Sequence, residues 1–148
     1  MRELPNSIDE RISGALHGAA RVWRQALDKR LKHLGIGQSG WMTIAMVAKA
    51  AEPLSQRALA DLVGVEGPSM VSMLDRLERG GLVTRAPSAH DRRVKLVQLT
   101  DAGRKIYAEV HTVAQGFRAD LFDGLDPARL AIAAEVLETL RKRIEESL

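Results

Sequence analysis

Apolar residues recur at steps of three and four along most of the chain, which is the spacing of amphipathic helices. The pattern over residues 8–34 predicts one long helix that ends at the glycines after it. A second helix is expected to begin near Ser39, a suitable N-cap, and to end before Pro53. Two more long helices are predicted behind Thr100 and behind Asp126, which also suit N-cap positions. The chain is therefore expected to be mainly helical.

The middle of the chain combines two short helices with a hairpin. Ser55 can cap the first short helix, and a glycine-containing turn separates it from a second helix over Pro68–Arg79. The apolar residues expected on the buried faces of the two helices are Ala58, Leu59, Leu62 and Val63, then Val71, Leu74 and Leu77. Residues 82–99 place β-branched and aliphatic runs on both sides of a turn-prone stretch, which predicts a β-hairpin. A hairpin directly behind a helix-turn-helix is typical of a winged helix-turn-helix.

These elements divide the chain into two regions. Residues 37–100 are expected to form a winged helix-turn-helix with a two-stranded wing, and residues 1–36 and 101–148 a helical dimerisation region. The flanking helices carry more apolar surface than the winged module can cover. A second copy of the chain is the simplest cover, because two-fold dimers are the commonest oligomers and a palindromic duplex mirrors their symmetry.

Basic residues gather in two segments, although the net charge of the whole chain is only +3. Residues 11–33 hold six basic residues and one acidic residue, and residues 85–95 hold four basic residues and one acidic residue. Residues 101–148 hold seven basic and nine acidic residues, so the C-terminal third has no footprint for a polyanion. The basic character therefore lies in the first helix and in the expected wing.

Composition and missing motifs exclude several classes of protein. The chain has no cysteine, which excludes disulfides, thiolate metal sites, cysteine nucleophiles and a thiol-oxidation switch. Its four histidines are scattered, and no HExxH, GxSxG or P-loop pattern occurs, so we expect no enzyme and no metal or cofactor site. No apolar run is long enough for a signal sequence or a membrane span, and we expect a cytoplasmic location.

The expected wing carries a resemblance to a known family. Residues 91–100 read Asp-Arg-Arg-Val-Lys-Leu-Val-Gln-Leu-Thr, which resembles the Asp-x-Arg, five spacers, Leu-Thr signature of the MarR family of bacterial transcription regulators. Leu74–Val83 is similar to the end of the family's recognition helix and the start of its wing, and the resemblance covers roughly Arg11–Leu140. The stretches most similar to the SlyA-like subgroup are Trp23–Arg24, Leu27–Leu31, Trp41 and Gly64–Ser69.

The resemblance implies a homodimer that binds double-stranded DNA, with a recognition helix in the major groove and a wing in the neighbouring minor groove. It also implies loss of DNA affinity when a small, usually anionic aromatic molecule binds between the two regions. SlyA-like members also displace nucleoid-structuring proteins, so an architectural or counter-silencing protein without ligand control is an alternative. A winged-helix adaptor that binds protein and not DNA is another. The operator, and the choice between repression and activation, stay open.

Polar residues of the two short helices are candidates for DNA contact. Ser69 and Ser72 can hydrogen-bond to base edges or phosphates, and Met73 can meet a thymine methyl group. SlyA-like proteins carry arginine at the position of Ser72, so their base preference is not transferred. The complete set on these helices is Ser55, Gln56, Arg57, Pro68, Ser69, Ser72, Met73 and Arg76. Ser55 serves equally well as a cap alone, and a solvated polar face is the alternative for the rest.

The wing supplies a second group of candidates. Arg93 or Arg92 is expected to enter the minor groove, because the negative potential of a narrow groove attracts inserted arginine. Asp91 is expected to pair with a neighbouring arginine and to fix the tip. The other arginine, Arg85 and Lys95 would contact phosphates and supply salt-dependent affinity. A solvated basic loop is the alternative.

Two tryptophans suit either the core or a ligand pocket. Arg21 and Arg24 accompany Trp23, and Ser39 lies near Trp41, so cations and a hydroxyl group stand beside flat apolar surfaces suited to an aromatic carboxylate. Matching positions in SlyA-like proteins line a salicylate-type pocket. The ligand-binding candidates are His17, Arg21, Trp23, Arg24, Ser39 and Trp41.

Overall fold

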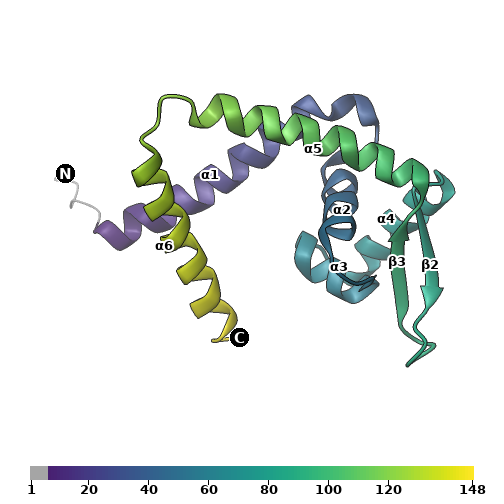
Figure 1. Cartoon of the computed structure of the whole chain (residues 1–148). Helices are drawn as coiled ribbons and strands as arrows, with labels where there is room; N and C mark the ends of the chain where they lie inside the picture. The colour runs from purple at the N-terminus through teal and green to yellow at the C-terminus, as the bar shows by residue number, and fades with distance from the viewer. Residues whose placement is uncertain (1–6) are drawn as a thin grey trace, which may run out of the picture. The chain divides into compact units, whose positions relative to one another are not determined.

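A computed structural model describes residues 7–148 as two units, the first extending to Gln115 and the second covering Gly116–Leu148. The helices are α1 (Ile8–Arg30), α2 (Gly37–Lys49), α3 (Gln56–Val63), α4 (Gly67–Arg79), α5 (Asp101–Phe122) and α6 (Pro127–Glu145), with a 3₁₀ turn η1 (Lys32–Leu34) after α1. The strands are β1 (Leu54–Ser55), β2 (Val83–Pro87) and β3 (Lys95–Leu99). This order confirms the predicted mainly helical fold with a winged helix-turn-helix in its middle (Figure 1).

α1 begins with a capping box and ends before the predicted residue 34. The Ser7 hydroxyl accepts the N–H of Glu10, and the Glu10 carboxylate accepts the N–H of Ser7 at 3.1 Å. The α-helix stops at Arg30, and the chain tightens into η1 before Gly35 adopts a left-handed φ of 70°. The glycine marks the end of the turn as predicted, but 3₁₀ hydrogen bonds replace the last α-helical turn.

α3 and α4 form the predicted helix-turn-helix. The Ser55 hydroxyl accepts the N–H of Ala58 at 3.1 Å and caps α3, and Gly64 ends this helix with a φ of 79°. Pro68 lies in the first turn of α4, and Gly80 follows its last residue. These caps confirm the predicted starts and ends of both helices.

α2 begins earlier than predicted. Gly37 is its first residue, and Ser39 lies inside the first turn, where its carbonyl oxygen accepts the Thr43 hydroxyl at 2.7 Å. The assignment of Ser39 as the N-cap is therefore wrong. Ile36 occupies that position, and its Cβ lies only 2.9 Å from where a Cβ on Gly40 would be. An apolar residue packed over a glycine starts this helix, which a rule based on polar caps does not detect.

β3 is the middle strand of a three-stranded antiparallel sheet in the order β1-β3-β2. β2 and β3 pair along their whole length, and their hairpin projects beyond α2, α3 and α4 (Figure 1). β1 adds two pairs, Leu54 with Val97 and Ser55 with Leu96. The predicted two-stranded wing describes the projecting hairpin but omits β1, because a strand of two residues is too short to show an alternating pattern.

The core of the winged module lies between α2, α3, α4 and the sheet. Its fully buried or nearly buried side chains include Ile44, Leu59, Met70, Leu74, Val83 and Val97. The inward face of α4 differs from the predicted one, because Met70 and Met73 are buried while Val71 is 40% exposed. Leu62 of α3 is also exposed, and Ala60 is buried. Methionine and valine are both apolar, so hydrophobicity alone did not determine which of them faces inward.

Apolar side chains stay exposed on two of the long helices. They include Ile8, Ile12, Leu16 and Val22 on α1, and Ile132, Val136, Leu137 and Ile144 on α6. The Asp126 carboxylate caps α6 as predicted and accepts the N–H of Ala128 at 3.0 Å. No helix within residues 7–148 is long and apolar enough to cross a membrane. The exposed faces agree with the surplus of apolar surface expected from the sequence.

Thr100 joins the start of α5 to the residues before β2. Its N–H donates to the Leu82 carbonyl at 3.1 Å, and its hydroxyl donates to the Gly81 carbonyl at 2.6 Å. The same hydroxyl accepts the N–H of Gly103 at 3.0 Å, which caps α5 as predicted. The contact is so close that a Cβ on Gly103 would lie 2.1 Å from the Leu82 carbonyl oxygen. Only glycine fits here without movement of the backbone.

Gly103→Ala is expected to destabilise the folded chain, because the new methyl group meets a backbone oxygen that must shift. Overpacking of this kind costs about 1–3 kcal/mol. Gly116→Ala in the same helix is the matched control, since nothing lies within 4 Å of its new methyl group and alanine favours a helix over glycine by about 1 kcal/mol. Denaturant unfolding followed by circular dichroism should place Gly103→Ala below the wild type and Gly116→Ala at or above it. Equal midpoints for the two variants would contradict a tight junction.

Candidate nucleic-acid interface

α4 presents a largely polar face opposite its buried stripe. The exposed residues of the helix that surround this face include Pro68, Ser69, Val71, Ser72, Arg76 and Arg79. Every DNA-contact candidate predicted on α4 except Met73 is thus exposed. The face offers hydroxyl groups, two apolar side chains and two guanidinium groups, which are the groups that contact base edges and phosphates.

Met73 lies in the core and not on this face. Only 7% of the residue is exposed, and its sulfur lies 3.6 Å from where a Cβ on Gly40 of α2 would be. The guanidinium of Arg76 approaches the same sulfur at 3.7 Å. The predicted contact of Met73 with a thymine methyl group cannot be made from this position, because the side chain packs on α2. Val71, which is 40% exposed, is an apolar residue of α4 that is accessible instead.

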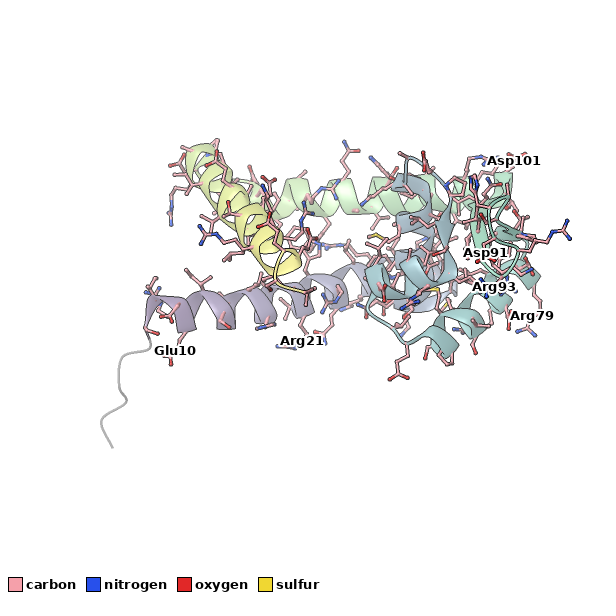
Figure 2. All side chains as sticks on the ribbon, turned by 90° about the horizontal axis from the view of Figure 1, so that it is seen from below. Glu10, Arg21, Arg79, Asp91, Arg93 and Asp101 are labelled. Carbon is pink, nitrogen blue, oxygen red and sulfur yellow. The ribbon has the colours of Figure 1, made fainter. Side chains whose placement is uncertain are left out.

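Two residues of α4 that the sequence reasoning missed lie on its accessible surface. Arg79 follows Ser72 by two helical turns, so the two share a face. Figure 2 shows Arg79 at the same end of the first unit as Asp91 and Arg93 of the wing. Counting the helical period from Ser72 would have found Arg79. Val71 was missed because the sequence pattern assigned it to the core.

Two neighbouring hollows lie between the start of α3, α4 and the strands of the wing. Gln56 and Val71 line both hollows, which measure about 550 and 350 Å³. Arg57 lines the larger hollow, and Lys95 lines the smaller one. Four of the predicted contact residues therefore line these hollows: Gln56 and Arg57 of α3, Arg85 of β2 and Lys95 of β3. The Ser55 hydroxyl already accepts the N–H of Ala58 as the cap of α3. An anion at the start of this helix would therefore contact backbone N–H groups and the Arg57 side chain.

The tip of the wing is ordered by Asp91. Its carboxylate accepts the backbone N–H of Arg93 at 3.0 Å and the Nε and Nη2 groups of the same residue at 3.2 Å each. These bonds lower the pKa of the Asp91 carboxyl, the side-chain bond from Arg93 being the main cause. The Arg93 side chain is nevertheless 91% exposed. The predicted pairing of Asp91 with a neighbouring arginine is confirmed, and the pair holds an accessible guanidinium in a defined orientation.

Arg85 is not exposed like the other wing cations. Its side chain is 17% exposed and makes ion pairs with Asp75 at 2.6 Å and Glu78 at 3.1 Å, both on α4. Its Nη1 group also donates to the Gln56 side-chain oxygen at 3.1 Å. The structure therefore places Arg85 between the wing, α4 and α3, where it contacts protein groups, whereas Arg92 and Lys95 are exposed.

Trp41, a predicted ligand residue, belongs to the core. It is 6% exposed, and its indole N–H donates to the Asp28 carboxylate at 3.1 Å, which ties α2 to α1. A buried indole with a satisfied N–H has the properties of a core tryptophan. Ser39, the other candidate on α2, is half-buried.

The ligand candidates on α1 differ in exposure. Trp23 is half-buried, whereas His17, Arg21 and Arg24 are exposed. Figure 2 shows Arg21 on the α1 ribbon, away from the wing. The half-buried indole and the exposed cations provide the apolar surface and the positive charge that an aromatic anion requires.

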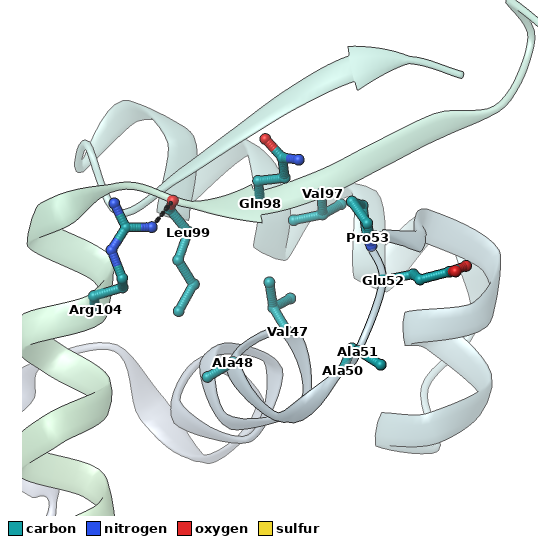
Figure 3. Close-up of a pocket in the computed structure, with 10 residues that line it drawn as sticks. All are labelled: Val47, Ala48, Ala50, Ala51, Glu52, Pro53, Val97, Gln98, Leu99 and Arg104. Carbon is teal, nitrogen blue, oxygen red and sulfur yellow. Dashed lines mark hydrogen bonds between the residues drawn. The ribbon is translucent and has the colours of Figure 1, made fainter. Parts of the chain in front are cut away.

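A separate cavity of about 370 Å³ lies behind the wing, between the end of α2, the loop after it, β3 and the first turn of α5. Figure 3 shows Val47, Val97 and Leu99 lining it and Arg104 at one side. Arg104 donates to the Leu99 carbonyl at 3.1 Å and pairs with Asp101. No predicted site residue lines this cavity. Among residues 7–148 no group of three acidic or histidine side chains is placed to hold a metal ion.

Comparisons with known proteins agree with this geometry. A model of the MarR family matches residues 34–94, from η1 to the tip of the wing. The transcriptional regulator PA3341 is 36% identical, with 91% of this chain and 98% of that chain covered and a TM-score of 0.84. CouR from Rhodococcus jostii RHA1, solved with bound p-coumaroyl-CoA, is 23% identical over 91% of this chain and 94% of that chain, with a TM-score of 0.76.

The transcriptional regulator SlyA is 20% identical over 92% of this chain and 95% of that chain, with a TM-score of 0.78. At this identity SlyA and CouR share the fold with the chain, and the likeness to SlyA does not by itself define a subgroup. PA3341 is similar over almost the entire length of both chains, and the family model covers the helix-turn-helix and the wing as far as its tip, before β3. By its sequence and its fold, the chain belongs to the MarR family.

Proposed function

We propose that the chain is a homodimeric transcriptional regulator that recognises a pseudo-palindromic DNA operator. The observation that carries the proposal is the exposed polar face of α4 beside a wing whose tip holds an accessible, oriented arginine. A helix of this kind fits the major groove, and an accessible arginine at the tip of the wing suits the minor groove, whose negative potential attracts it. The same proposal includes a bacterial origin and a cytoplasmic site of action.

The proposed base-reading residues lie on α4. Ser69, Ser72 and Arg76 offer donors and acceptors to base edges, and Val71 takes the role of apolar contact with a thymine methyl group that Met73 cannot fill. Phosphate contacts come from the backbone at the start of α3 and from side chains around α4 and the wing. The proposed phosphate-binding side chains are Gln56, Arg57, Arg79, Arg92 and Lys95.

Arg93 is the proposed minor-groove residue. Its guanidinium is oriented by Asp91 while its side chain stays accessible, so less conformational entropy is lost when it enters a groove. Arg92 has no such partner among the described hydrogen bonds and is assigned to phosphate.

The proposed dimer uses residues 1–36 and 101–148. The exposed apolar side chains of α1 and α6 support this assignment, because each helix leaves uncovered a face that a second copy can bury. A two-fold dimer would place its recognition helices on half-sites about one helical turn apart, roughly 34 Å.

Release by a small aromatic anion such as salicylate is the second part of the proposal. Trp23, with Arg21 and Arg24 on the same helix, is the proposed ligand contact, while Trp41 supports the site from the core. CouR, which shares the fold, has been solved with p-coumaroyl-CoA bound, so this architecture accommodates an aromatic acyl group. A SlyA-like counter-silencing role without ligand control is the alternative within the same fold.

The purified full chain is expected to bind a duplex from its own promoter region ~10³-fold or more tightly than a scrambled duplex. Fluorescence anisotropy at two salt concentrations measures this preference. Equal and steeply salt-dependent binding to both duplexes would favour the architectural function. No binding at low salt would overturn DNA recognition and favour an adaptor that binds protein.

Arg93→Ala is expected to weaken operator binding. It should also reduce the slope of log affinity against log salt by about 0.9, because one cation that displaces counterions from DNA is lost. Arg92→Ala is the matched control for charge at the tip, and it should change the slope similarly but retain more of the preference for the operator. Unchanged operator affinity in Arg93→Ala would remove the wing from the interface.

The same variant changes the titration of Asp91. Its pKa is lowered in the folded chain mainly by the hydrogen bond from the Arg93 side chain, so Arg93→Ala should raise this pKa and Arg92→Ala should not. Because the pKa is lowered by folding, the pair is intact at neutral pH and is lost only as the pH falls through that lowered value. An NMR titration of the Asp91 carboxyl carbon measures the change.

Trp23→Ala is expected to abolish salicylate-induced release while leaving DNA binding without ligand largely intact, because the indole is only half-buried. Anisotropy titration with and without salicylate measures both effects, and circular dichroism checks the fold. Gln25→Ala, an exposed polar position near Trp23 on α1, is the control and should still respond to salicylate. A Trp23→Ala variant that unfolds would assign the side chain to the core.

A further inference from the structure

Arg85 joins three elements of the DNA-facing surface through a single guanidinium group. Nη2 donates to the Asp75 carboxylate at 2.6 Å and to the Glu78 carboxylate at 3.1 Å, and both carboxylates belong to α4. Nη1 donates to Gln56, the first residue of α3, at 3.1 Å. The backbone N–H of Arg85 adds a bond to the other Glu78 oxygen at 3.1 Å. The base of the wing is thereby fastened to α4 and α3 together.

The alternation of residues along β2 explains why Arg85 points at the helices. Successive side chains of a strand lie on opposite faces, and Val83, two residues earlier, is buried in the core. Arg85 pairs across the sheet with Val97, which is also fully buried. Arg85 therefore lies on the helix-facing side of the hairpin, at the point where the apolar core gives way to the polar side chains of α4.

The contacts of Arg85 leave little of the group for DNA. Its side chain is 17% exposed, compared with 91% for Arg93 at the tip. Of the five N–H donors of a guanidinium, three are used in the bonds to Asp75, Glu78 and Gln56. The paired carboxylates raise the pKa of Arg85, while Arg85 lowers the pKa of Glu78, so both remain charged at neutral pH.

The charges of Asp75 and Glu78 give this contact a second consequence. Both carboxylates lie on the proposed recognition helix and are partly exposed, where an unpaired negative charge repels phosphate. Charge pairing with Arg85 offsets part of this repulsion, because its one positive charge is shared between the two carboxylates. Loss of Arg85 would therefore both release the wing and add unpaired negative charge to the surface of α4.

We propose that Arg85 is a positioning residue that sets the wing against the recognition helix and offsets part of the negative charge of Asp75 and Glu78, so that major-groove and minor-groove contacts are made together. The proposal rests on the proposed DNA-binding function. It replaces the sequence-based expectation that Arg85 contacts phosphate. The two roles differ in one measurable respect: a positioning residue acts through its protein partners, and a phosphate contact acts without them.

A double-mutant cycle separates the two roles. Arg85→Ala is measured in the wild-type chain and in the Asp75→Asn/Glu78→Gln chain, by anisotropy against a duplex from the protein's own promoter region. We expect a loss of affinity of about tenfold or more in the first background and about twofold or less in the second, because contacting residues are strongly non-additive. Equal losses in both backgrounds would overturn the proposal and restore a direct phosphate contact.

Two further variants serve as a control and as a conservative substitution in the cycle. Arg57→Ala removes an exposed arginine from α3 that lies outside the network, and it should cost the same affinity in both backgrounds. Arg85→Lys keeps the charge but lacks the planar fork that reaches several acceptors at once, so it should lose nearly as much affinity as Arg85→Ala. Affinity close to that of the wild type in Arg85→Lys would indicate a phosphate contact and contradict the positioning role. Arg85→Lys also keeps the test open if Arg85→Ala does not fold.

Hydrogen exchange without DNA provides a readout that does not depend on the proposed function. Arg85→Ala and Arg85→Lys should exchange the amide hydrogens of β2 and β3 faster than the wild type, whereas Arg57→Ala should not. Unchanged exchange in the hairpin would overturn the positioning role even if DNA affinity fell. If the wild-type chain binds no duplex, the proposed function fails, and the exchange experiment still decides whether Arg85 holds the wing on α4.

Discussion

β3 is the central strand of the sheet and pairs with β1 and β2. The arrangement of the side chains between the wing and the helices depends on this double pairing. Val97 lies opposite Leu54 of β1 on one edge and opposite Arg85 of β2 on the other. Cross-strand partners share a face of the sheet, so all three side chains face the helices. Val97 is fully buried in the core, while Arg85 meets the polar side chains at its border. The same register therefore sets both the apolar packing beneath the wing and the polar contact beside it.

The helical part of the fold could be predicted because its signals are local. Ser55 and Asp126 make the cap bonds expected of them, and Gly64 adopts the left-handed conformation that suits a glycine. The start of α2 was predicted wrongly, since Ile36 and not a polar side chain precedes it. β1 was missed because its existence depends on pairing with β3, some forty residues away in the chain. Contacts of this kind leave no periodic pattern in the sequence.

The site was predictable in kind but not in every residue. The wing motif identified Asp91 and an arginine as a pair, and the geometry selects Arg93. Met73 was assigned to DNA because three- and four-residue spacing allows two neighbouring stripes, and the packing of α2 decides between them. Arg85 was grouped with the other cations by charge alone. Side chains alternate between the two faces of a strand, so counting two residues from the buried Val83 would have placed Arg85 on the face toward the helices. Strand register therefore carries information about the role of a charged residue.

The junction at Thr100 couples α5 directly to the hairpin of the wing. Only this residue separates the end of β3 from the first residue of α5, and it is hydrogen-bonded to the chain just before β2 while Gly103 sits against the same backbone. No slack segment lies between the strand and the helix to absorb a rotation. The first turn of α5 and the base of the hairpin are therefore coupled directly, and a rotation of this end of the helix is expected to move the base of the wing with it.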